Sequence, residues 1–355
     1  KVFQFVQKPK EIARHLSRFV IGQREAKKAL SVALCDHYAH VALELSGRRF
    51  PFYQKQNILL IGPTGVGKTH LIRSAAEYLR VPFVKADATK FSETGYVGAD
   101  VEEIVRDLVR VSEPNSELAA YGIVYVDEID KLATSKGGFV GRDVSGRGVQ
   151  ANLLKLLEDG EVRLFGESRA GGGEKMKNGS SFRTISTRNI LFVASGAFSG
   201  LPEVVGRRLA REGVRIPKSA TVDWFLMRAT TADFVAYGLE PEFIGRLPVR
   251  VVCHALGEKE LYEVLRRSES SLLRQYCHIF GAYGIELDFE DGALRKVAEL
   301  AAREQMGARG LATVLERIFR DIKFEAPSAG VKRLKISEGV VENPRLALEG
   351  WKEAG

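Results

Sequence analysis

The chain has 355 residues, of which 45% are hydrophobic and 28% charged, values typical of a globular protein of about two domains. No apolar run approaches the roughly 20 residues that cross a bilayer, and the first residues show no secretory signal, so we expect a cytoplasmic protein without a membrane partner. The net charge of +8 is spread along the sequence rather than gathered in one block, which argues against a nucleic-acid partner.

The three cysteines are widely separated along the chain. Cys35, Cys253 and Cys277 form neither a Cys-x-x-Cys pair nor another zinc-binding spacing. We therefore expect thiols that pack in the core rather than a metal site.

Short apolar runs alternate with helical patterns from residue 57 to residue 257. This alternation predicts a large α/β domain with a mostly parallel, five-stranded sheet. Residues 1–56 show helical spacing on either side of Gly22 and are expected to pack on this domain as a helical segment. The candidate strands are β-branched or aromatic and apolar on both faces, as buried parallel strands are: Ile58–Ile61, Pro82–Lys85, Ile123–Val126, Ile190–Ala194 and Val249–Val252.

Residues 258–355 are predicted to form a second domain that is small and mainly helical. Apolar residues between Leu261 and Tyr276 recur at spacings of three, four and seven, which is the pattern of an amphipathic helix. Two more helices and one short strand are expected after them, at about 292–304, 309–324 and 334–336.

The strongest chemical signal follows the first predicted strand. Residues 62–69 read Gly-Pro-Thr-Gly-Val-Gly-Lys-Thr, a complete G-x-x-x-x-G-K-[ST] phosphate loop between a strand and a helix. Its glycines let backbone N–H groups turn toward phosphate oxygens at the positive end of the helix. We expect Lys68 to hold the β and γ phosphates and the Thr69 hydroxyl to bind Mg²⁺. The predicted nucleotide-binding residues of the loop are Pro63, Thr64, Gly65, Val66, Gly67, Lys68, Thr69 and His70.

A second signal stands where the strand Ile123–Val126 runs into Asp127 and Glu128. Carboxylates at the carboxyl end of a central strand lie where α/β sheets bind their ligands. We expect Asp127 to bind Mg²⁺ through water, and Glu128 to polarise the water that attacks the γ-phosphate. A surface carboxylate pair that caps a helix is the alternative, and the phosphate loop upstream disfavours it. The sequence contains no Asn-Lys-x-Asp element for guanine, so the expected cofactors are ATP and Mg²⁺.

With these motifs, the chain resembles the AAA+ protein unfoldases, and the ClpX type most closely, from Lys10 to about Leu348. The HslU ATPases are near relatives, but they carry a large inserted domain before the Asp-Glu strand, where this chain has only a short helix. Besides the phosphate loop, the resemblance rests on Val-Ile-Gly-Gln at 20–23, Gly-Tyr-Val-Gly at 95–98, Asp-Glu-Ile-Asp-Lys at 127–131, Arg-Asp-Val-Ser-Gly at 142–146, Pro-Glu-Phe-Ile-Gly-Arg at 241–246 and Gly-Ala-Arg-Gly-Leu at 307–311.

The resemblance implies roles for five further residues near the nucleotide. Arg246 matches the arginine that reaches into the nucleotide site of a neighbouring subunit, and Arg309 matches the sensor arginine of the second domain. Ser195 falls where the family places a polar sensor beside the γ-phosphate. Val20 and Ile21 would pack against adenine, although core packing is an equally good account of two aliphatic residues.

The resemblance also implies a ring of identical subunits, a hexamer, with an axial pore. Tyr96 and Val97 match the aromatic pore loop that grips polypeptide, and Arg142 lies in a segment that resembles a second pore loop. The glycine-rich stretch 166–181 resembles a loop at the pore entrance. We therefore expect an ATP-dependent unfoldase that threads protein substrates through its pore.

Two features of the ClpX type are missing from this sequence. No four-cysteine zinc domain precedes Lys10, and residues 206–238 lack the Ile-Gly-Phe or Leu-Gly-Phe tripeptide that docks into the ClpP peptidase. Because an apolar anchor is what a peptidase pocket needs, its absence argues against a peptidase partner. Three alternatives stay open: the regulatory ATPase of a compartmental protease, a nucleic-acid-remodelling ATPase, and a nucleotide switch that threads nothing.

Overall fold

The computed structural model describes residues 7–48, 50, 52–91, 100–134, 144–164 and 183–348. Its contacts divide the chain into two compact units, which are described separately. Unit 1 consists of residues 1–12, 28–61 and 75–252, and unit 2 of residues 13–27, 62–74 and 253–355. The phosphate loop thus belongs to the same compact unit as the C-terminal helices.

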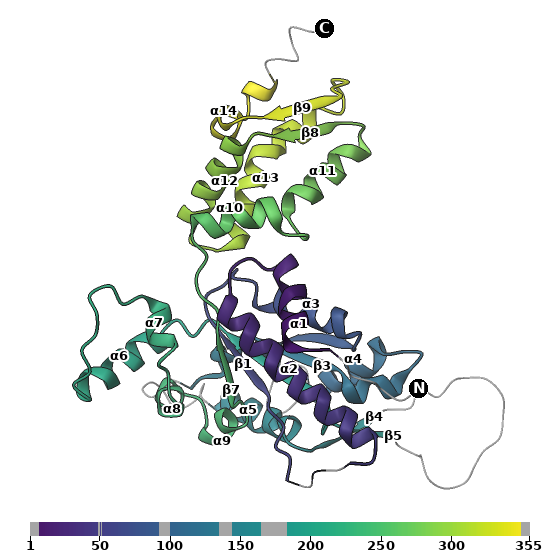
Figure 1. Ribbon diagram of the computed structural model, residues 1–355, viewed down its shortest axis with the longest axis vertical. Helices are drawn as coiled ribbons and strands as arrows, with labels where there is room; N and C mark the ends of the chain where they lie inside the picture. Colours follow the sequence, from purple (N-terminus) through teal and green to yellow (C-terminus); the bar gives the residue numbers. More distant parts are fainter. Residues whose placement is uncertain are drawn as a thin grey trace, which may run out of the picture. The chain divides into compact units, whose positions relative to one another are not determined.

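Unit 1 contains the sheet to which β1, β3 and β7 belong in Figure 1. This sheet has five strands in the order β2-β3-β6-β1-β7, and every neighbouring pair of strands is parallel. The central strands β1, β3 and β6 are buried almost throughout, because helices cover both faces of a parallel sheet. The expected α/β class with a five-stranded sheet is confirmed. The strands are β1 (Ile58–Ile61), β2 (Phe83–Asp87), β3 (Ile123–Asp127), β6 (Leu191–Gly196) and β7 (Val249–Val252).

Helices and one hairpin surround this sheet. The hairpin pairs β4 (Glu161–Leu164) with β5 (Arg183–Ser186) in antiparallel register. The helices of unit 1 are α4 (Glu103–Val111), α5 (Val144–Leu157), α6 (Leu201–Arg211), α7 (Val222–Leu226), α8 (Thr231–Tyr237) and α9 (Pro241–Gly245), with short 3-10 turns η1 (Ala88–Lys90), η2 (Ser116–Tyr121) and η3 (Ile129–Leu132). Helices α1 (Pro9–Phe19), α2 (Arg24–Leu45) and α3 (Lys68–Leu79) contribute residues to both units.

The C-terminal part of unit 2 is mainly helical, as expected for the second domain. Its core gathers aromatic rings around Phe319, whose centroid lies 4.7 Å from that of Tyr276 and 5.4 Å from that of Phe280. The helices are α10 (Glu258–Arg267), α11 (Leu272–Ala282), α12 (Asp291–Arg303), α13 (Ala308–Glu325) and α14 (Glu338–Glu342). The sequence also predicted β9 (Arg333–Ile336), but it did not predict β8 (Glu286–Phe289), the short strand that pairs with β9 in parallel.

Two of the three cysteines are buried, as predicted, but Cys277 is exposed, because it lies on the solvent side of α11. Among the described residues, no group of three or more His, Cys, Asp or Glu side chains could hold a metal ion. Within the same part of the chain, the helices are either too short or too polar to cross a membrane.

His37 on α2 is a fully buried titratable group in unit 1. Its Nε2 lies 3.1 Å from the carbonyl oxygen of Asn189, which can only accept, so Nε2 carries the proton. The ring also meets Tyr38 edge to face, with centroids 4.9 Å apart. Burial, together with the charge of Lys55, lowers the pKa of His37 to about 3.

We predict that His37 makes the fold sensitive to acid. The unfolded histidine takes up a proton near its ordinary pKa of about 6.5, whereas the folded one does so only near about 3. Between these values the unfolded state binds more protons, so the free energy of unfolding decreases as pH falls, by roughly 3 kcal/mol at about pH 4. Circular dichroism melting of a His37→Gln variant should show a smaller loss of melting temperature on acidification than wild type. Equal losses in the two proteins would contradict the prediction.

Candidate nucleotide-binding site

The phosphate loop leaves β1 and enters α3 through three glycines with positive φ angles. Gly62, Gly65 and Gly67 have φ values of 147°, 78° and 97°, in a region that residues with a side chain rarely adopt. Lys68, the first residue of α3, is buried, and its Nζ donates to the carbonyl oxygens of Gly62 at 2.6 Å and of Pro63 at 2.8 Å. The loop therefore holds its lysine against its own backbone at the N-terminus of the helix.

The start of α13 packs directly on this loop. The Ala308 N–H donates to the Gly65 carbonyl oxygen at 2.9 Å. A Cβ atom on Gly65 would lie 2.0 Å from the Met306 carbonyl oxygen, and one on Gly67 would lie 3.2 Å from Cγ1 of Val20. Glycine is required at Gly65 by space as well as by backbone angle.

Arg309 is the second residue of α13. The contact between Ala308 and Gly65 places its backbone one residue from the phosphate loop. Its side chain is exposed and makes no hydrogen bond or ion pair with any part of the chain that the structure describes. Unit 2 thus presents an uncommitted guanidinium on a helix that begins at the loop.

Residues 20–23 form a turn that is fixed within unit 2. The buried amide of Gln23 donates to the His254 carbonyl oxygen at 2.7 Å and accepts from the His254 N–H at 3.0 Å. Val20 is buried against Gly67, whereas Ile21 is only half-buried. This arrangement is compatible with both predicted roles of Val20 and Ile21, which are contact with adenine and packing in the core.

His70, on the first turn of α3, is engaged by the same unit. Its Nε2 lies 2.8 Å from Oγ of Ser270, and its ring meets that of Phe19 at a centroid distance of 6.1 Å. These contacts attach the beginning of α3 to its neighbours in unit 2. Thr69 precedes His70 and is half-buried.

Asp127 ends β3 at the centre of a polar network in unit 1. Ser195, fully buried on β6, donates through Oγ to Asp127 Oδ1 at 2.6 Å and lies 2.7 Å from the Tyr125 hydroxyl. On the other side, Nζ of Lys85 on β2 lies 2.9 Å from Asp127 Oδ2. Burial raises the pKa of Asp127, but the hydrogen bonds from Ser195 and Lys85 and the lysine charge outweigh it and bring the pKa below its ordinary value. Asp127 is therefore ionised at neutral pH.

Glu128 follows in the left-handed conformation, with φ 59° and ψ 32°. Its backbone N–H donates to Asp127 Oδ1 at 3.1 Å, while its side chain is exposed and unpaired with respect to the described residues. The turn is fixed from below by the buried Asp130, whose carboxylate accepts from the N–H groups of Ala197 and Phe198, both at 3.3 Å. A strained residue with a free carboxylate is typical of active sites.

Arg246 follows α9, and its backbone and side chain are held separately. Asn57 donates through Nδ2 to the carbonyl oxygens of Arg246 and Leu157, both at 3.1 Å, and accepts from the Phe192 N–H at 3.3 Å. The guanidinium is half-exposed and lies 2.7 Å from Oε1 of Glu158. The backbone is thus anchored to the sheet, and one carboxylate contacts a side chain that reaches into solvent.

The predicted pore residues Tyr96, Val97 and Arg142 lie outside the described residues.

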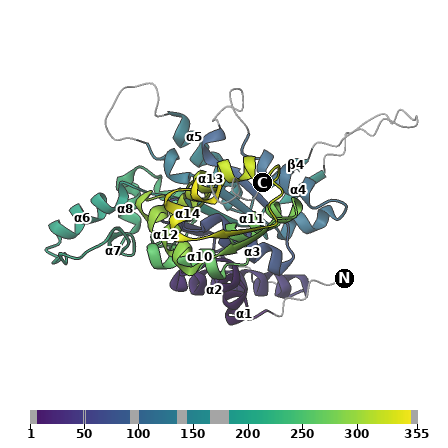
Figure 2. The same cartoon turned by 90° about the horizontal axis from the view of Figure 1, so that it is seen from above.

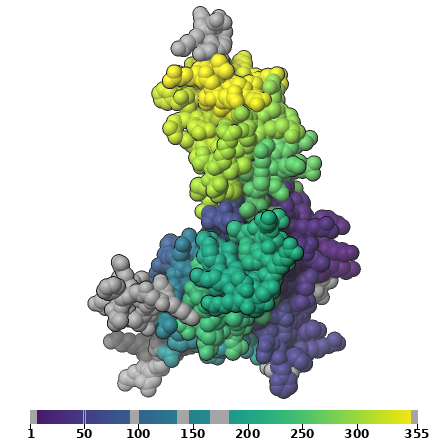
Figure 3. Space-filling view, turned by 90° about the vertical axis from the view of Figure 1, so that its left-hand side faces the viewer, coloured from purple at the N-terminus to yellow at the C-terminus, as the bar shows by residue number. Residues whose placement is uncertain are grey.

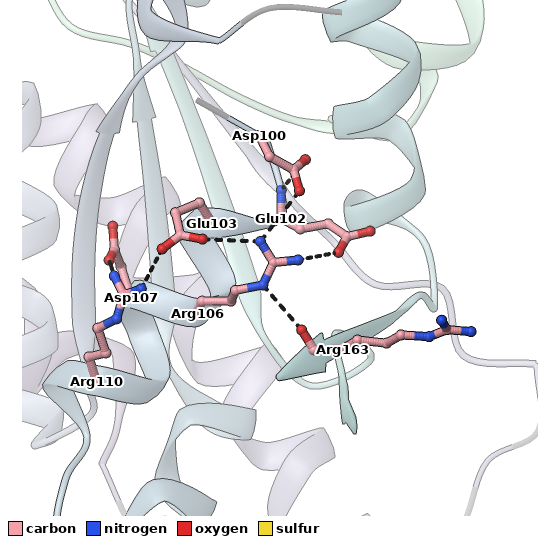
Figure 4. A network of polar contacts seen from close by, with 7 residues as sticks. All are labelled: Asp100, Glu102, Glu103, Arg106, Asp107, Arg110 and Arg163. Carbon is pink, nitrogen blue, oxygen red and sulfur yellow. Dashed lines mark hydrogen bonds and ion pairs between the residues drawn. The ribbon is translucent and has the colours of Figure 1, made fainter. Parts of the chain in front are cut away.

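A cluster of polar side chains surrounds Arg106 of α4 (Figure 4). Arg106 forms ion pairs with Asp100 at 3.4 Å, Glu102 at 2.8 Å and Glu103 at 3.0 Å. Its Nε also donates to the carbonyl oxygen of Arg163 on β4 at 3.1 Å. Arg106, which is only partly buried, therefore ties Asp100, which follows the Gly-Tyr-Val-Gly motif in sequence, to the β4–β5 hairpin.

Sequence reasoning missed the contacts of three residues that shape this site. Gln23 belongs to the Val-Ile-Gly-Gln motif at 20–23, whereas Glu158 belongs to no motif. The partners of both residues are distant in sequence, so no local pattern predicts their contacts. Lys85 did leave a signal, because it is a charged residue at the end of an otherwise apolar predicted strand.

We predict that Gly65→Ala lowers nucleotide affinity by about tenfold or more, because the new Cβ collides with the Met306 carbonyl and the backbone angle becomes strained. Titration with a fluorescent ADP analogue would measure this. Gly281→Ala is the matched control, since a Cβ there meets nothing within 4 Å, and it should bind like wild type. Wild-type affinity in Gly65→Ala would count against the geometry described for the loop.

Comparison with known proteins covers nearly the whole chain. Residues 53–250 match the AAA domain (Cdc48 subfamily), and residues 256–334 match the C-terminal, D2-small domain of ClpB protein. The chain is 39% identical over 345 residues to the ATP-dependent Clp protease ATP-binding subunits ClpX of Borrelia duttonii and Borrelia recurrentis, covering 95% of this chain and 79% of each relative. It is also 39% identical over 373 residues to ClpX 3 of Methylococcus capsulatus, covering 99% of this chain and 84% of the relative.

These matches agree with the motifs and with the geometry around Asp127. The chain is a nucleotide-binding ATPase with an AAA domain followed by a helical domain, and it belongs to the ClpX type of the AAA+ family.

Proposed function

We propose that this ATPase is a ring-forming motor that unfolds proteins by drawing polypeptide through an axial pore. The observation that carries the proposal is the pair Asp127 and Glu128. One carboxylate is fully engaged at the end of β3, and the next is turned outward on a strained residue with no described partner. A fixed charge beside a free base is the arrangement that ATP hydrolysis requires. The similarity to ClpX proteins over 95% of the chain supports the coupling to unfolding.

In this proposal the phosphate loop binds the phosphates, and Lys68 exchanges its two carbonyl partners for the β and γ phosphates. The Thr69 hydroxyl and the ionised carboxylate of Asp127 are hard oxygen donors, which Mg²⁺ prefers. When bound, Mg²⁺ would neutralise charge on the phosphates. Ser195 fixes the Asp127 carboxylate, and Glu128 orients the attacking water.

The two arginines take separate roles in the proposal. Arg309 has no described partner on a helix that starts at the phosphate loop, so it suits a sensor of the nucleotide bound to its own subunit. Arg246 would exchange Glu158 for the γ-phosphate of a neighbouring subunit, and a guanidinium there is worth about 10³ to 10⁵ in rate in related enzymes. A shared site of this kind needs a ring, and we propose a hexamer.

A second candidate follows from the relatives' names, which describe ATP-binding subunits of a Clp protease. In unit 1 the segment 206–238, which lacks the docking tripeptide, contributes to α6, α7 and α8. These helices lie together beside the sheet in Figure 1 and at the left of Figure 2, and they form a continuous surface that is coloured teal in Figure 3. Val222 and Met227 on this segment are 57% and 64% exposed, so it does offer apolar side chains. Co-purification with a peptidase ring would favour this candidate.

We also propose a cytoplasmic location for this protein.

We predict that Glu128→Gln lowers the ATP hydrolysis rate by about 100-fold or more, because the amide cannot act as a base. Its ATP affinity should stay at the wild-type value, since the phosphate loop is untouched. A coupled phosphate-release assay and nucleotide titration would measure both. The matched control is Glu117→Gln, at an exposed position of η2, which should hydrolyse ATP normally. Full hydrolysis by Glu128→Gln would remove the base assignment.

We predict that Tyr96→Ala retains ATP hydrolysis but no longer unfolds a tagged fluorescent protein, because the pore loses the tyrosine side chains that grip the substrate. Loss of substrate fluorescence would report unfolding, and phosphate release would report hydrolysis. Tyr283→Ala, which removes an exposed tyrosine of unit 2, should retain both activities. If Tyr96→Ala unfolded the substrate at the wild-type rate, the assignment of Tyr96 to a pore loop would be wrong.

A further inference from the structure

Lys85 contacts the carboxylate at the centre of the proposed site, yet it belongs to none of the motifs that define that site. It lies on β2 directly opposite Tyr125 of β3 in parallel register. Its side chain runs past the Tyr125 ring, with Nζ 5.9 Å from the ring centroid, and ends 2.9 Å from Asp127 Oδ2. The ion pair is only partly exposed, because 37% of the lysine side chain and 18% of the aspartate side chain are accessible.

The neighbouring carboxylate does not compete for this lysine. Asp87 is level with Asp127 in the register of β2 and β3. Its Oδ1 accepts from both the backbone N–H and the hydroxyl of Thr89, at 2.9 and 2.7 Å, and so caps η1. Lys85 is therefore committed to Asp127.

Both oxygens of Asp127 are consequently engaged from within unit 1. Oδ1 accepts from Ser195 and from the Glu128 N–H, and Oδ2 receives Lys85. Ser195 and the N–H group are neutral, so they orient the carboxylate without cancelling its charge. Lys85 differs, because it brings a full positive charge that is covalently tethered and permanently close.

We propose that Lys85 competes with the divalent cation for Asp127 and thereby sets the Mg²⁺ concentration at which the protein binds nucleotide tightly. This inference rests on the proposed role of Asp127 toward Mg²⁺. A cation that approaches Asp127 must either displace the ammonium or tolerate a like charge beside it, and both weaken metal binding. Lys85 is thus a positioning residue that acts through Asp127 and sets the Mg²⁺ concentration that the enzyme requires for tight nucleotide binding.

The test measures nucleotide binding without hydrolysis. A fluorescent ADP analogue is titrated at a series of free Mg²⁺ concentrations, and the half-saturating Mg²⁺ concentration is determined for each variant. Lys85→Met removes the charge and keeps the length of the side chain, so its half-saturating Mg²⁺ concentration should fall about tenfold, equivalent to about 1.4 kcal/mol. Lys85→Gln should give the same result and serves if Lys85→Met does not fold.

Two charge controls separate competition from a merely structural ion pair. Lys85→Arg keeps the positive charge and should retain the wild-type Mg²⁺ requirement. Lys90→Met removes an exposed lysine of η1 that has no described ion pair, and it should also behave like wild type. An unchanged or higher Mg²⁺ requirement in Lys85→Met and Lys85→Gln would overturn the inference.

Asp127→Asn distinguishes this inference from the proposal beneath it. Loss of the carboxylate charge should raise the half-saturating Mg²⁺ concentration if Asp127 serves the metal. No change would overturn the role of Asp127 and the Lys85 inference together. A rise in Asp127→Asn without any response to the Lys85 variants would overturn only the competition.

Discussion

The parallel pairing of β3, β6 and β1 is the constraint on which the rest of unit 1 depends. Because parallel strands end at the same edge of a sheet, Asp127 at the end of β3 meets Ser195 near the end of β6. The end of β6 is crowded, since a Cβ on Gly196 would lie 2.5 Å from Asp130 Oδ1. Glycine there leaves room for Asp130 to support the turn that carries Glu128. Strand order thus converts separate sequence motifs into one polar cluster.

The protonation state of Asp127 depends on opposing effects of burial and of its neighbours in this cluster. Its carboxylate is half-buried, which disfavours the charge, but Ser195 and Lys85 restore it and lower the pKa. The carboxylate therefore stays ionised and oriented before any ligand arrives. The same neighbours occupy its two oxygens, so a metal ion would enter against an existing partner. Preorganisation and competition are two consequences of one network.

The local parts of this architecture follow from sequence, and the non-local parts do not. The phosphate loop and the pair Asp127–Glu128 are predictable, because consecutive residues carry the whole chemical pattern. The Gln23–His254 contact joins residues 231 positions apart, and it depends on packing that no periodicity encodes. β8 was missed because four residues alternating between polar and apolar gain a partner only from the distant β9. The contact between Lys85 and Asp127 could be predicted only from the strand order, which places β2 beside β3.

ATP hydrolysis by this protein is proposed to be coupled to the movement of a polypeptide. The most direct measurement is the steady-state ATPase rate of the wild-type chain, alone and with an unstructured polypeptide or with DNA. In the proposed ring, a polypeptide in the axial pore should change the rate of ATP hydrolysis, whereas DNA should leave that rate unaltered. A rate that ignores the polypeptide, or one that DNA stimulates with a steep loss at higher salt, would contradict the account.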